Sequence, residues 1–120
     1  MNNDNTDVMR AADPSGATER DIALMREAIS LLEQCPECEV PVAAVVTLDG
    51  EIEASGVNGR ETYNDPTAHA EVVAIRAAAQ KLGRWNLSDC ELYVTLEPCA
   101  MCAGTVVYSR IKRVVFGAYD

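Results

Sequence analysis

ELYVTLEPCAMCAGTVVYSRIKRVVFG, residues 91–117, is the stretch that decides the fold. ELYVTL is a short apolar run that predicts a buried strand, and KRVVFG ends the stretch with another strand. The segment between them, PCAMCAGTVVYSR, predicts a helix with Pro98 in a favourable first-turn position. Strand-helix-strand units with short connections predict a sheet that carries helices on both faces.

The residues before this stretch continue the same α/β pattern. Thr18, followed three residues later by Asp21, is a plausible helix cap, and helical apolar spacing then runs to about Gln34. Asp49-Gly50 lies between two strand-like runs and predicts a hairpin. TAHAEVVAIRAAAQKLG predicts an Ala-rich helix that ends at Gly83. The expected order is therefore helix, hairpin, helix, strand, helix, strand.

The length and composition indicate one globular domain. The chain has 120 residues, of which 48% are apolar, and no apolar run approaches the roughly 20 residues of a membrane span. Residues 1–17 predict a disordered, acidic leader, and residues 18–120 the folded domain. The N-terminus lacks the basic start and apolar block of a secretory signal, so we expect a cytoplasmic protein.

The net charge of −9 is unfavourable for a nucleic-acid-binding protein, but its distribution is uneven. Residues 1–59 contain twelve acidic and three basic residues, whereas residues 60–120 contain seven of each. The second half of the chain could therefore still meet a phosphate backbone. The same charge is equally consistent with an ordinary acidic protein.

Two Cys-x-x-Cys pairs stand out among the five cysteines, CPEC at residues 35–38 and PCAMC at residues 98–102. An odd number of cysteines argues against a closed disulfide framework. In a reducing compartment, pairs with this spacing are more often metal ligands or redox groups than structural bridges.

His69, Glu71, Cys99 and Cys102 form the pattern that carries chemistry. His69 and the two cysteines lie near the starts of two predicted helices, where unpaired N–H groups favour thiolate. One imidazole and two thiolates supply the three protein ligands of a catalytic zinc site, which leaves a fourth position for water. Glu71 is then best placed as a proton shuttle beside that water. This combination, H-x-E followed by P-C-x-x-C, is the signature of zinc deaminases.

Two other interpretations explain less of the pattern. A redox pair of Cys99 and Cys102 leaves His69 and Glu71 without a role. A four-cysteine zinc site that includes Cys35 and Cys38 needs some sixty intervening residues, whereas zinc ribbons have roughly 15–20. Cys35 and Cys38 are therefore left as an unassigned helix exit. Cys90 is expected to be an ordinary buried cysteine.

The sequence resembles the bacterial tRNA adenosine deaminases of the cytidine deaminase-like superfamily. The resemblance rests on VPVAAVV, NDPTAHAEVVAIR, LYVTLEPCAMCAG and SRIKRVVFGAYD, and runs from about Glu19 to Asp120. It implies a three-layer α/β/α sandwich around a central, mixed, five-stranded sheet, a homodimer, and a hydrolase that converts the wobble adenosine of the tRNA anticodon loop to inosine with release of ammonia.

The resemblance also implies roles for individual residues. His69, Cys99 and Cys102 would hold zinc, and Glu71 would be the general acid and base. Asn58 corresponds to the asparagine that contacts the flipped-out nucleotide, and the backbone N–H of Cys99 would help to hold the attacking water or the developing oxyanion. Asp120 falls where the family has an acidic residue in the anticodon-loop groove.

The sequence departs from the family in three places. Relatives continue for several tens of residues past Asp120, so a face or edge of the sheet near residues 112–118 is expected to be exposed. Ala43 replaces a glycine, and Val57 and Gly59-Arg60 replace the usual neighbours of Asn58.

Two alternative functions stay open. They are deamination of a small nucleobase such as guanine or cytosine, and a non-catalytic zinc-binding scaffold, for which Glu71 has no use. The basic residues before the last strand could contact phosphate or could equally form a solvated helix end; they are Arg110, Lys112 and Arg113.

Overall fold

The computed structural model describes residues 16–119 and contains the expected succession of elements. The expected leader lies outside the described residues as far as residue 15. In chain order the elements are α2 (Glu19–Ser30), the 3-10 helix η1 (Leu31–Gln34), β1 (Ala43–Leu48), β2 (Glu51–Val57), α3 (Ala70–Leu82), β3 (Cys90–Val94), α4 (Ala100–Ser109) and β4 (Arg113–Phe116).

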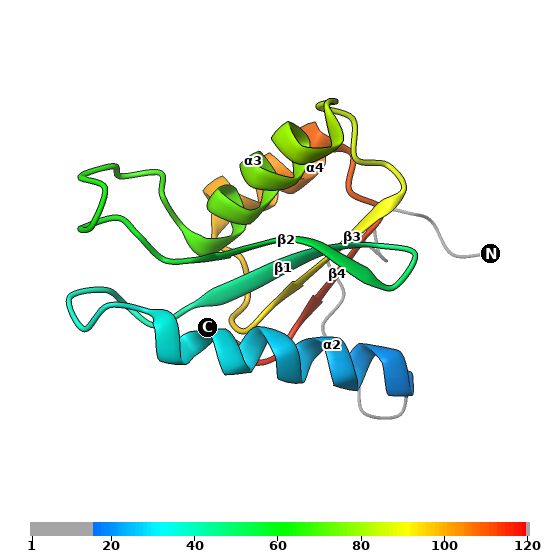
Figure 1. Ribbon diagram of the computed structural model, residues 1–120, viewed down its shortest axis with the longest axis horizontal. Coiled ribbons are helices and arrows are strands. Elements are labelled where there is room, and N and C mark those ends of the chain that lie inside the picture. The colour runs from blue at the N-terminus through cyan, green and yellow to red at the C-terminus, as the bar shows by residue number, and fades with distance from the viewer. Residues whose placement is uncertain (1–15, 120) are drawn as a thin grey trace.

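The strands form one mixed sheet between two layers of helices. The strand order is β2-β1-β3-β4; β1 pairs antiparallel with both β2 and β3, and β3 pairs parallel with β4. Helix α2 covers one face of the sheet, while α3 and α4 lie together on the other face (Figure 1). This arrangement confirms the predicted three-layer α/β/α sandwich, with four strands among the described residues rather than five.

Local signals in the sequence begin and end these elements where they were expected. Thr18 forms a capping box with Asp21 at the start of α2. Asp49 and Gly50 both have positive φ, 52° and 80°, as a two-residue type I′ hairpin requires. Gly83 ends α3 in the left-handed conformation with φ 71°.

The position of Pro98 differs from the prediction. Helix α4 begins at Ala100, and its N-cap is Cys99, whose backbone is extended with φ −73° and ψ 175°. Pro98 therefore precedes the N-cap instead of lying in the first turn. The chain stays extended for one residue longer, which brings Cys99 to the N-cap position.

A small-residue contact fixes α3 close to strand β2. Ala70, Ala74 and Ala78 are fully buried along one side of α3. A Cβ added to Gly56 would lie 2.8 Å from the Ala70 carbonyl oxygen and 2.9 Å from the Ala74 nitrogen. The helix backbone thus rests directly on the strand, and this contact holds the beginning of α3 in place.

Strand β4 is the outermost strand on its side of the described sheet, so the expected edge is present. Its side chains are not exposed, however, because they alternate between the two layers. Val114 and Phe116 join the core beneath α3 and α4, and Val115 joins the core against α2. The expectation of an exposed apolar face near residues 112–118 is therefore wrong for these side chains.

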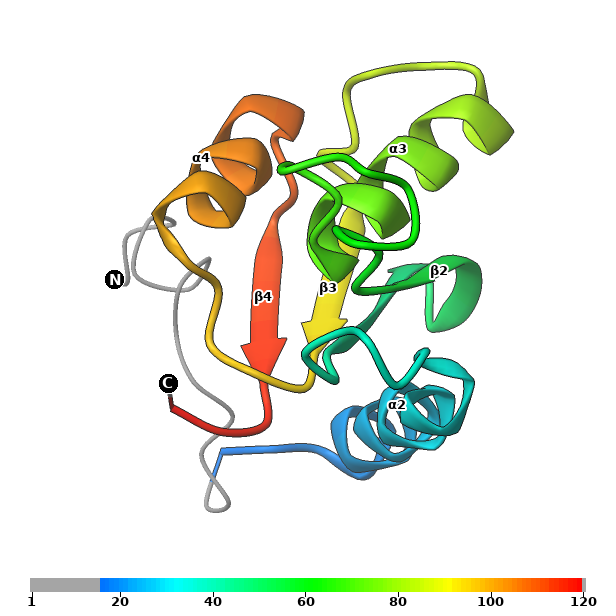
Figure 2. The ribbon, with the colours of Figure 1, turned by 90° about the vertical axis from the view of Figure 1, so that its left-hand side faces the viewer.

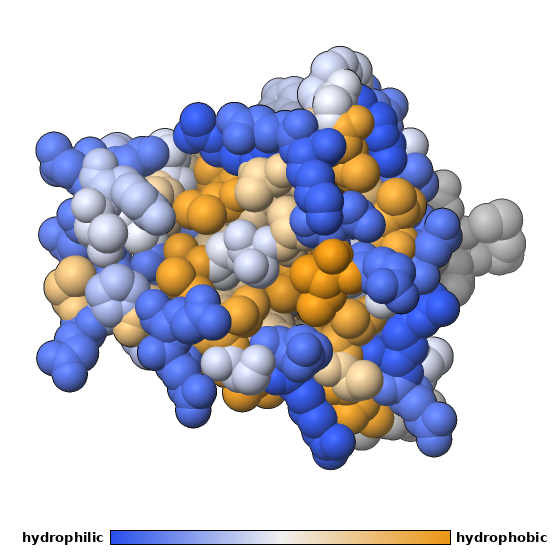
Figure 3. Space-filling view, in the orientation of Figure 1, coloured by the Kyte–Doolittle hydropathy of each residue, from blue (hydrophilic) through white to orange (hydrophobic). Residues whose placement is uncertain are grey.

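Apolar side chains also reach the surface on the side of the molecule that shows β2. Figure 3 shows hydrophobic residues across the middle of this face, between α2 and α3, framed by hydrophilic ones. Ile52 of β2 and Val40, which precedes β1, are among the exposed large apolar residues. Within residues 16–119, no helix is both long enough and apolar enough to cross a membrane.

Candidate metal centre and its pocket

The candidate metal ligands meet where α3 and α4 begin. Figure 2 views the molecule from this end, with both helices starting toward the viewer. His69 is the N-cap residue of α3 and Cys99 is the N-cap residue of α4, and neither side chain makes a capping hydrogen bond. Because N-cap positions favour Ser, Thr, Asp and Asn, two helices here begin without their usual stabilisation.

The two helix starts direct their side chains at one point. His69 Nδ1 lies 3.6 Å from Cys99 Sγ and 3.5 Å from Cys102 Sγ. The three potential ligand atoms all lie within 4.8 Å of one another. Tetrahedral zinc with ordinary Zn–N and Zn–S bonds separates a nitrogen from a sulfur by about 3.6 Å. The ligand set and its spacing therefore fit zinc.

The surroundings of Cys102 show why a cation suits this cluster. Cys102 is fully buried, and this burial, together with the neighbouring Glu71 carboxylate, raises the pKa of its thiol well above the usual value. The expected help from the helix start does not by itself make this residue a thiolate. A metal ion would supply the missing positive charge, because it deprotonates a coordinating thiol.

Glu71 lies in the first turn of α3 and is only 4% exposed. Burial raises the pKa of its carboxyl group, although hydrogen bonds from its own backbone N–H and from the Cys102 thiol oppose that shift. A buried carboxylate next to a metal cluster and a pocket is suited to proton transfer.

A pocket of about 180 Å³ opens beside the cluster and collects most of the predicted site residues. His69, Glu71, Cys99 and Asn58 all line it. The remaining lining residues, to which sequence analysis gave no role in a site, are Val40, Val42, Arg60, Ala70, Leu96 and Glu97. Ala70 lies between His69 and Glu71 at the start of α3. The others come from segments that precede β1 or follow β2 and β3, and only their position at strand ends could have indicated them.

Asn58 is held on the pocket wall by three hydrogen bonds. Its backbone N–H donates to the Val42 carbonyl oxygen at 3.0 Å, and its Nδ2 donates to the Val40 carbonyl oxygen at 3.0 Å. Its Oδ1 accepts from the backbone N–H of Arg60 at 3.3 Å. The side chain therefore has a fixed orientation at the end of strand β2.

Several other predicted residues lie elsewhere. Asp120 is outside the described residues. Arg113 is committed to a bidentate ion pair with Asp21, with nitrogen–oxygen distances of 2.8 and 2.7 Å. Of the two alternatives left open for Arg113, a phosphate contact and a solvated helix end, neither describes this side chain, because its guanidinium pairs with Asp21 of α2. Arg110 forms the left-handed C-cap of α4.

The other cysteines do not join the metal cluster. Among residues 16–119, His69, Cys99 and Cys102 form the one group of at least three potential ligands that lie close enough to share an ion. Cys35 and Cys38 are outside this group, so the four-cysteine alternative is excluded for the described chain. Cys90 is fully buried as expected, and burial raises the pKa of its thiol to about 11.

Comparison with known proteins identifies the family to which this chain belongs. The chain belongs to the family described as the cytidine and deoxycytidylate deaminase zinc-binding region, whose model matches residues 18–118. The fold and the ligand cluster are thus those of a zinc-binding deaminase domain.

Within this family, the similar curated relatives act on tRNA by name. The chain is 50% identical over 102 residues to the tRNA-specific adenosine deaminase of Bacillus subtilis, which covers 84% of this chain and 63% of the relative. It is 51% identical over 82 residues to the tRNA-specific adenosine deaminase of Aquifex aeolicus, which covers 68% of this chain and 54% of the relative. The chain therefore spans less than two thirds of the length of either relative.

Solved structures of two kinds resemble the chain. Guanine deaminase from Bacillus subtilis matches with a TM-score of 0.78 and 42% identity, covering 82% of this chain and 64% of that one. A structure from a study of A-to-I editing by tRNA:A34 deaminases at the wobble position matches with a TM-score of 0.71 and 46% identity, covering 80% and 72%.

Proposed function

We propose that this chain catalyses the zinc-dependent, hydrolytic deamination of adenosine to inosine at the wobble position of a tRNA anticodon loop. The observation that carries the chemistry is the His69–Cys99–Cys102 cluster beside a pocket that His69, Cys99 and the buried Glu71 line. The names of the curated relatives, at about 50% identity, support tRNA as the substrate.

The proposed reaction assigns one role to each residue. His69, Cys99 and Cys102 hold zinc, which when bound supplies the Lewis acid that activates the attacking water. Glu71 accepts a proton from that water and passes it to a nitrogen of the adenine ring. The water oxygen forms a bond to C6, and Glu71 then takes the second proton from the resulting C6 hydroxyl. Glu71 delivers this proton to the amine, the C6–N6 bond breaks, ammonia leaves and the C6 carbonyl of inosine forms.

Recognition of the base falls to the pocket wall in this proposal. The target adenosine leaves its stack and enters the pocket, as it must for chemistry on a base. Asn58 contacts the base from the position in which its hydrogen bonds to Val40 and Arg60 hold it. The N–H of Cys99 helps to hold the reacting oxygen, and Asp120 lines the groove for the anticodon loop.

A second candidate is the deamination of a free nucleobase such as guanine. The guanine deaminase of Bacillus subtilis is 42% identical to this chain and has a similar fold. Both candidates use the same metal cluster and Glu71, so they differ only in the substrate that the pocket accepts. A non-catalytic zinc scaffold, in contrast, has no need of a buried carboxylate beside the metal.

We further propose that the chain forms a homodimer and works in the cytoplasm, where its tRNA substrate is found. A groove between α3 and α4 supports the dimer, because it carries exposed aromatic side chains that favour a protein partner. Trp85 and Tyr108 line this groove together with Met101, and are 65% and 82% exposed. Sedimentation equilibrium of the purified protein tests the oligomeric state.

The substrate is tested by measuring ammonia release from three compounds under identical conditions. They are an anticodon stem-loop with adenosine at the wobble position, the same stem-loop with guanosine there, and free guanine. We expect release from the adenosine stem-loop alone. Release from free guanine but not from the stem-loop would establish the second candidate, and release from none of them, with zinc bound, would contradict both.

A further inference from the structure

A buried carboxylate outside the metal cluster joins two parts of the pocket wall. Glu39 lies between η1 and β1 and is 7% exposed. Its Oε1 accepts a hydrogen bond from the backbone N–H of Glu61 at 3.1 Å. Its Oε2 accepts two bonds of 2.6 Å from Thr62, one from the backbone N–H and one from the side-chain hydroxyl. One side chain thus holds three donors of a loop more than twenty residues away.

The two segments that Glu39 connects both line the pocket. Val40 and Val42 lie one and three residues after Glu39 and form one side of the wall. Asn58 and Arg60 lie three residues and one residue before Glu61 and form the other side. The three hydrogen bonds of Glu39 therefore fix the spacing between the two sides of the pocket mouth.

The bonded loop, residues 58–64, belongs to no helix or strand. Its internal bonds are turn-like, such as those from the N–H of Tyr63 to the Gly59 carbonyl and from the N–H of Asn64 to the Glu61 carbonyl. Burial would raise the pKa of Glu39, but the hydrogen bonds from Thr62 and Glu61 outweigh it and keep the pKa below its usual value. The carboxylate is thus charged when it holds the loop.

The neighbouring turn of CPEC supports the same wall. Cys35 Sγ lies 3.9 Å from the carbonyl oxygens of both Val40 and Asn58. The peptide that follows η1 is therefore packed against Asn58 and held to its loop through Glu39. This packing gives CPEC a place in the structure, although its cysteines are not metal ligands.

We propose that Glu39 is a positioning residue for substrate recognition. Its carboxylate fixes the loop of residues 58–64, and through that loop it presents Asn58 and Arg60 to the base and backbone of the substrate in the pocket. The inference rests on the proposed function, because it assumes that the pocket binds a nucleobase. Glu39 contacts neither the metal cluster nor Glu71, so its effect falls on binding more than on the chemical step.

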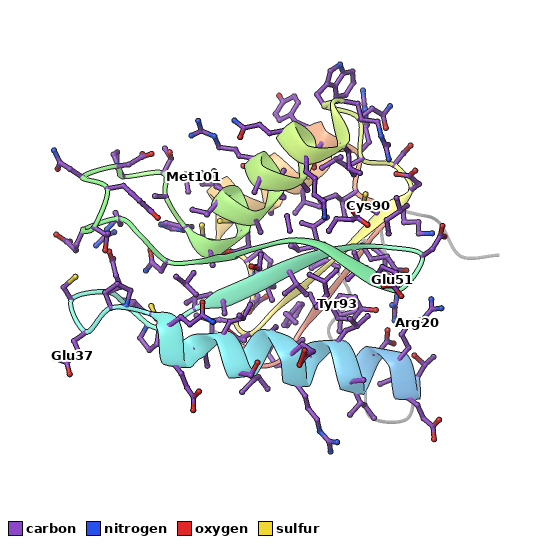
Figure 4. The ribbon with its side chains drawn as sticks, viewed as in Figure 1. Arg20, Glu37, Glu51, Cys90, Tyr93 and Met101 are labelled. Atoms are coloured by element: carbon purple, nitrogen blue, oxygen red, sulfur yellow. The ribbon has the colours of Figure 1, made fainter. Side chains whose placement is uncertain are left out.

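The first test compares Glu39→Ala with Glu37→Ala by steady-state kinetics on the adenosine stem-loop. Glu37 is exposed at the tip of the same turn and points away from the molecule (Figure 4), so it is a matched control. We expect Glu39→Ala to raise KM about tenfold and to change kcat less than about twofold. Zinc content is expected to stay equal to wild type, and Glu37→Ala to leave both constants unchanged.

Two milder variants keep the test decisive if Glu39→Ala folds poorly. Thr62→Val removes one of the three hydrogen bonds and keeps the carboxylate, so we expect a smaller rise in KM, about two- to threefold. Glu39→Gln keeps one acceptor oxygen and is expected to fall between Thr62→Val and Glu39→Ala. A fall in kcat with unchanged KM in these variants would overturn the proposal.

A second measurement does not depend on activity. Amide hydrogen exchange of the zinc-loaded protein without substrate reports on the N–H groups of Glu61 and Thr62 directly. We expect both to exchange at least about tenfold faster in Glu39→Ala than in wild type. Unchanged exchange would overturn the proposal. If wild type deaminates no substrate, the proposed function fails, and this exchange measurement alone decides whether Glu39 holds the loop.

Discussion

Two polar clusters, each with a buried carboxylate, lie on opposite faces of the sheet, and their charges are balanced in different ways. Beneath the sheet, Asp21 of α2 accepts two hydrogen bonds from Arg113 and one of 2.7 Å from the hydroxyl of Tyr93. Tyr93 lies between the sheet and α2 (Figure 4). The Arg113 guanidinium holds the pKa of Asp21 well below its usual range. Each polar side chain of this cluster, Asp21, Tyr93 and Arg113, has a hydrogen-bond partner within the protein.

The cluster above the sheet contains no ion pair like that of Asp21 and Arg113: His69 Nδ1 contacts the two cysteine sulfurs, and Glu71 accepts hydrogen bonds from its own backbone N–H and the Cys102 thiol. His69 and Cys99 leave two helix starts without a side-chain cap, and Cys102 is a buried thiol beside the buried Glu71. A positive charge between these side chains would stabilise the cysteine thiolates and offset the charge of the neighbouring Glu71 carboxylate. A buried polar group whose hydrogen bonds and charge are balanced within the protein contributes to the stability of the fold. A buried group whose charge is balanced only by an added cation indicates a metal-binding site.

The largest expected effect is on metal binding, through Cys99→Ala. Cys99 is exposed, so its replacement disturbs packing little, but it removes one of the three ligands. We expect zinc content to fall from about one ion per chain to near zero, and turnover to be lost with it. Zinc is measured by atomic absorption after dialysis.

Cys38→Ala is the matched control for this change, because Cys38 is also an exposed cysteine in a Cys-x-x-Cys pair. It is expected to retain zinc and activity. Loss of zinc in Cys38→Ala, with retention in Cys99→Ala, would reverse the assignment of the two pairs.

The next effect separates the metal from the proton carrier. Glu71→Gln keeps the size of the side chain and the three ligands, but it removes the group that transfers protons. We expect kcat to fall by about 10³-fold, within the range for general acid–base catalysis, with zinc content unchanged. Glu51→Gln, in the exposed hairpin, serves as the control (Figure 4). Retained activity in Glu71→Gln would remove Glu71 from the mechanism.

The cluster beneath the sheet is expected to affect stability and not turnover. Asp21→Asn breaks the ion pair with Arg113, and we expect the free energy of unfolding to fall by about 2–3 kcal/mol. The value lies below the roughly 3–5 kcal/mol of fully buried pairs because the Arg113 side chain is 29% exposed.

Urea denaturation measures this change. Asp89→Asn, which breaks the exposed pair with Arg84, is the control and is expected to cause no measurable change. If Asp21→Asn and Asp89→Asn lowered the free energy of unfolding equally, burial would not explain the strength of the Asp21–Arg113 pair.

Acid should weaken the same cluster. The pKa of Asp21 is lower in the folded state than in the unfolded chain, so its contribution is complete above about pH 4 and is lost as the pH falls further. Between pH 5 and pH 3 we expect wild type to lose about 1 kcal/mol of stability through this group. In Asp21→Asn that part of the pH dependence is expected to disappear, as denaturation at several pH values would show.

The smallest expected effect on stability concerns the N-cap of α2. Thr18 makes a side-chain capping hydrogen bond there, whereas His69 and Cys99 make none at the starts of α3 and α4. Thr18 caps α2 by accepting a hydrogen bond from the N–H of Asp21 at 3.0 Å. Thr18→Ala is expected to lower the free energy of unfolding by about 0.5–1 kcal/mol, measured by thermal denaturation. Ser30→Ala, at the other end of the helix, is expected to change it less. The reverse order would contradict the assigned cap.

Much of the fold was predictable because its signals are local. The capping box at Thr18, the Asp49-Gly50 turn and the C-terminal Gly83 act within a few residues of themselves. The meeting of the candidate metal ligands was also predictable in part, since His-x-Glu and Cys-x-x-Cys each place their side chains within a single helix start. The start of α4 was misplaced by one or two residues, because a proline is compatible with either side of an N-cap.

Other features were not predictable because they depend on residues far apart in the chain. Nothing in the sequence pointed to the roles of Arg113 in an ion pair and of Glu39 in a loop contact. Their partners, Asp21 and Thr62, lie 92 and 23 residues away and become neighbours only after the sheet has formed. The burial of Val115 on a face opposite to Val114 likewise depends on α2 covering that face.

The amino-acid sequence by itself determined the α/β order of elements and the chemical identity of the candidate metal ligands. Periodicity, turn residues and short motifs act locally and can be read without long-range contacts. The tertiary structure alone decided that the two helix starts meet, with His69 Nδ1 3.5–3.6 Å from both sulfurs. It also decided that Glu39 accepts hydrogen bonds from Glu61 and Thr62 in the loop beside the pocket. Burial and charge pairing depend on how the layers pack, and no local pattern encodes that packing.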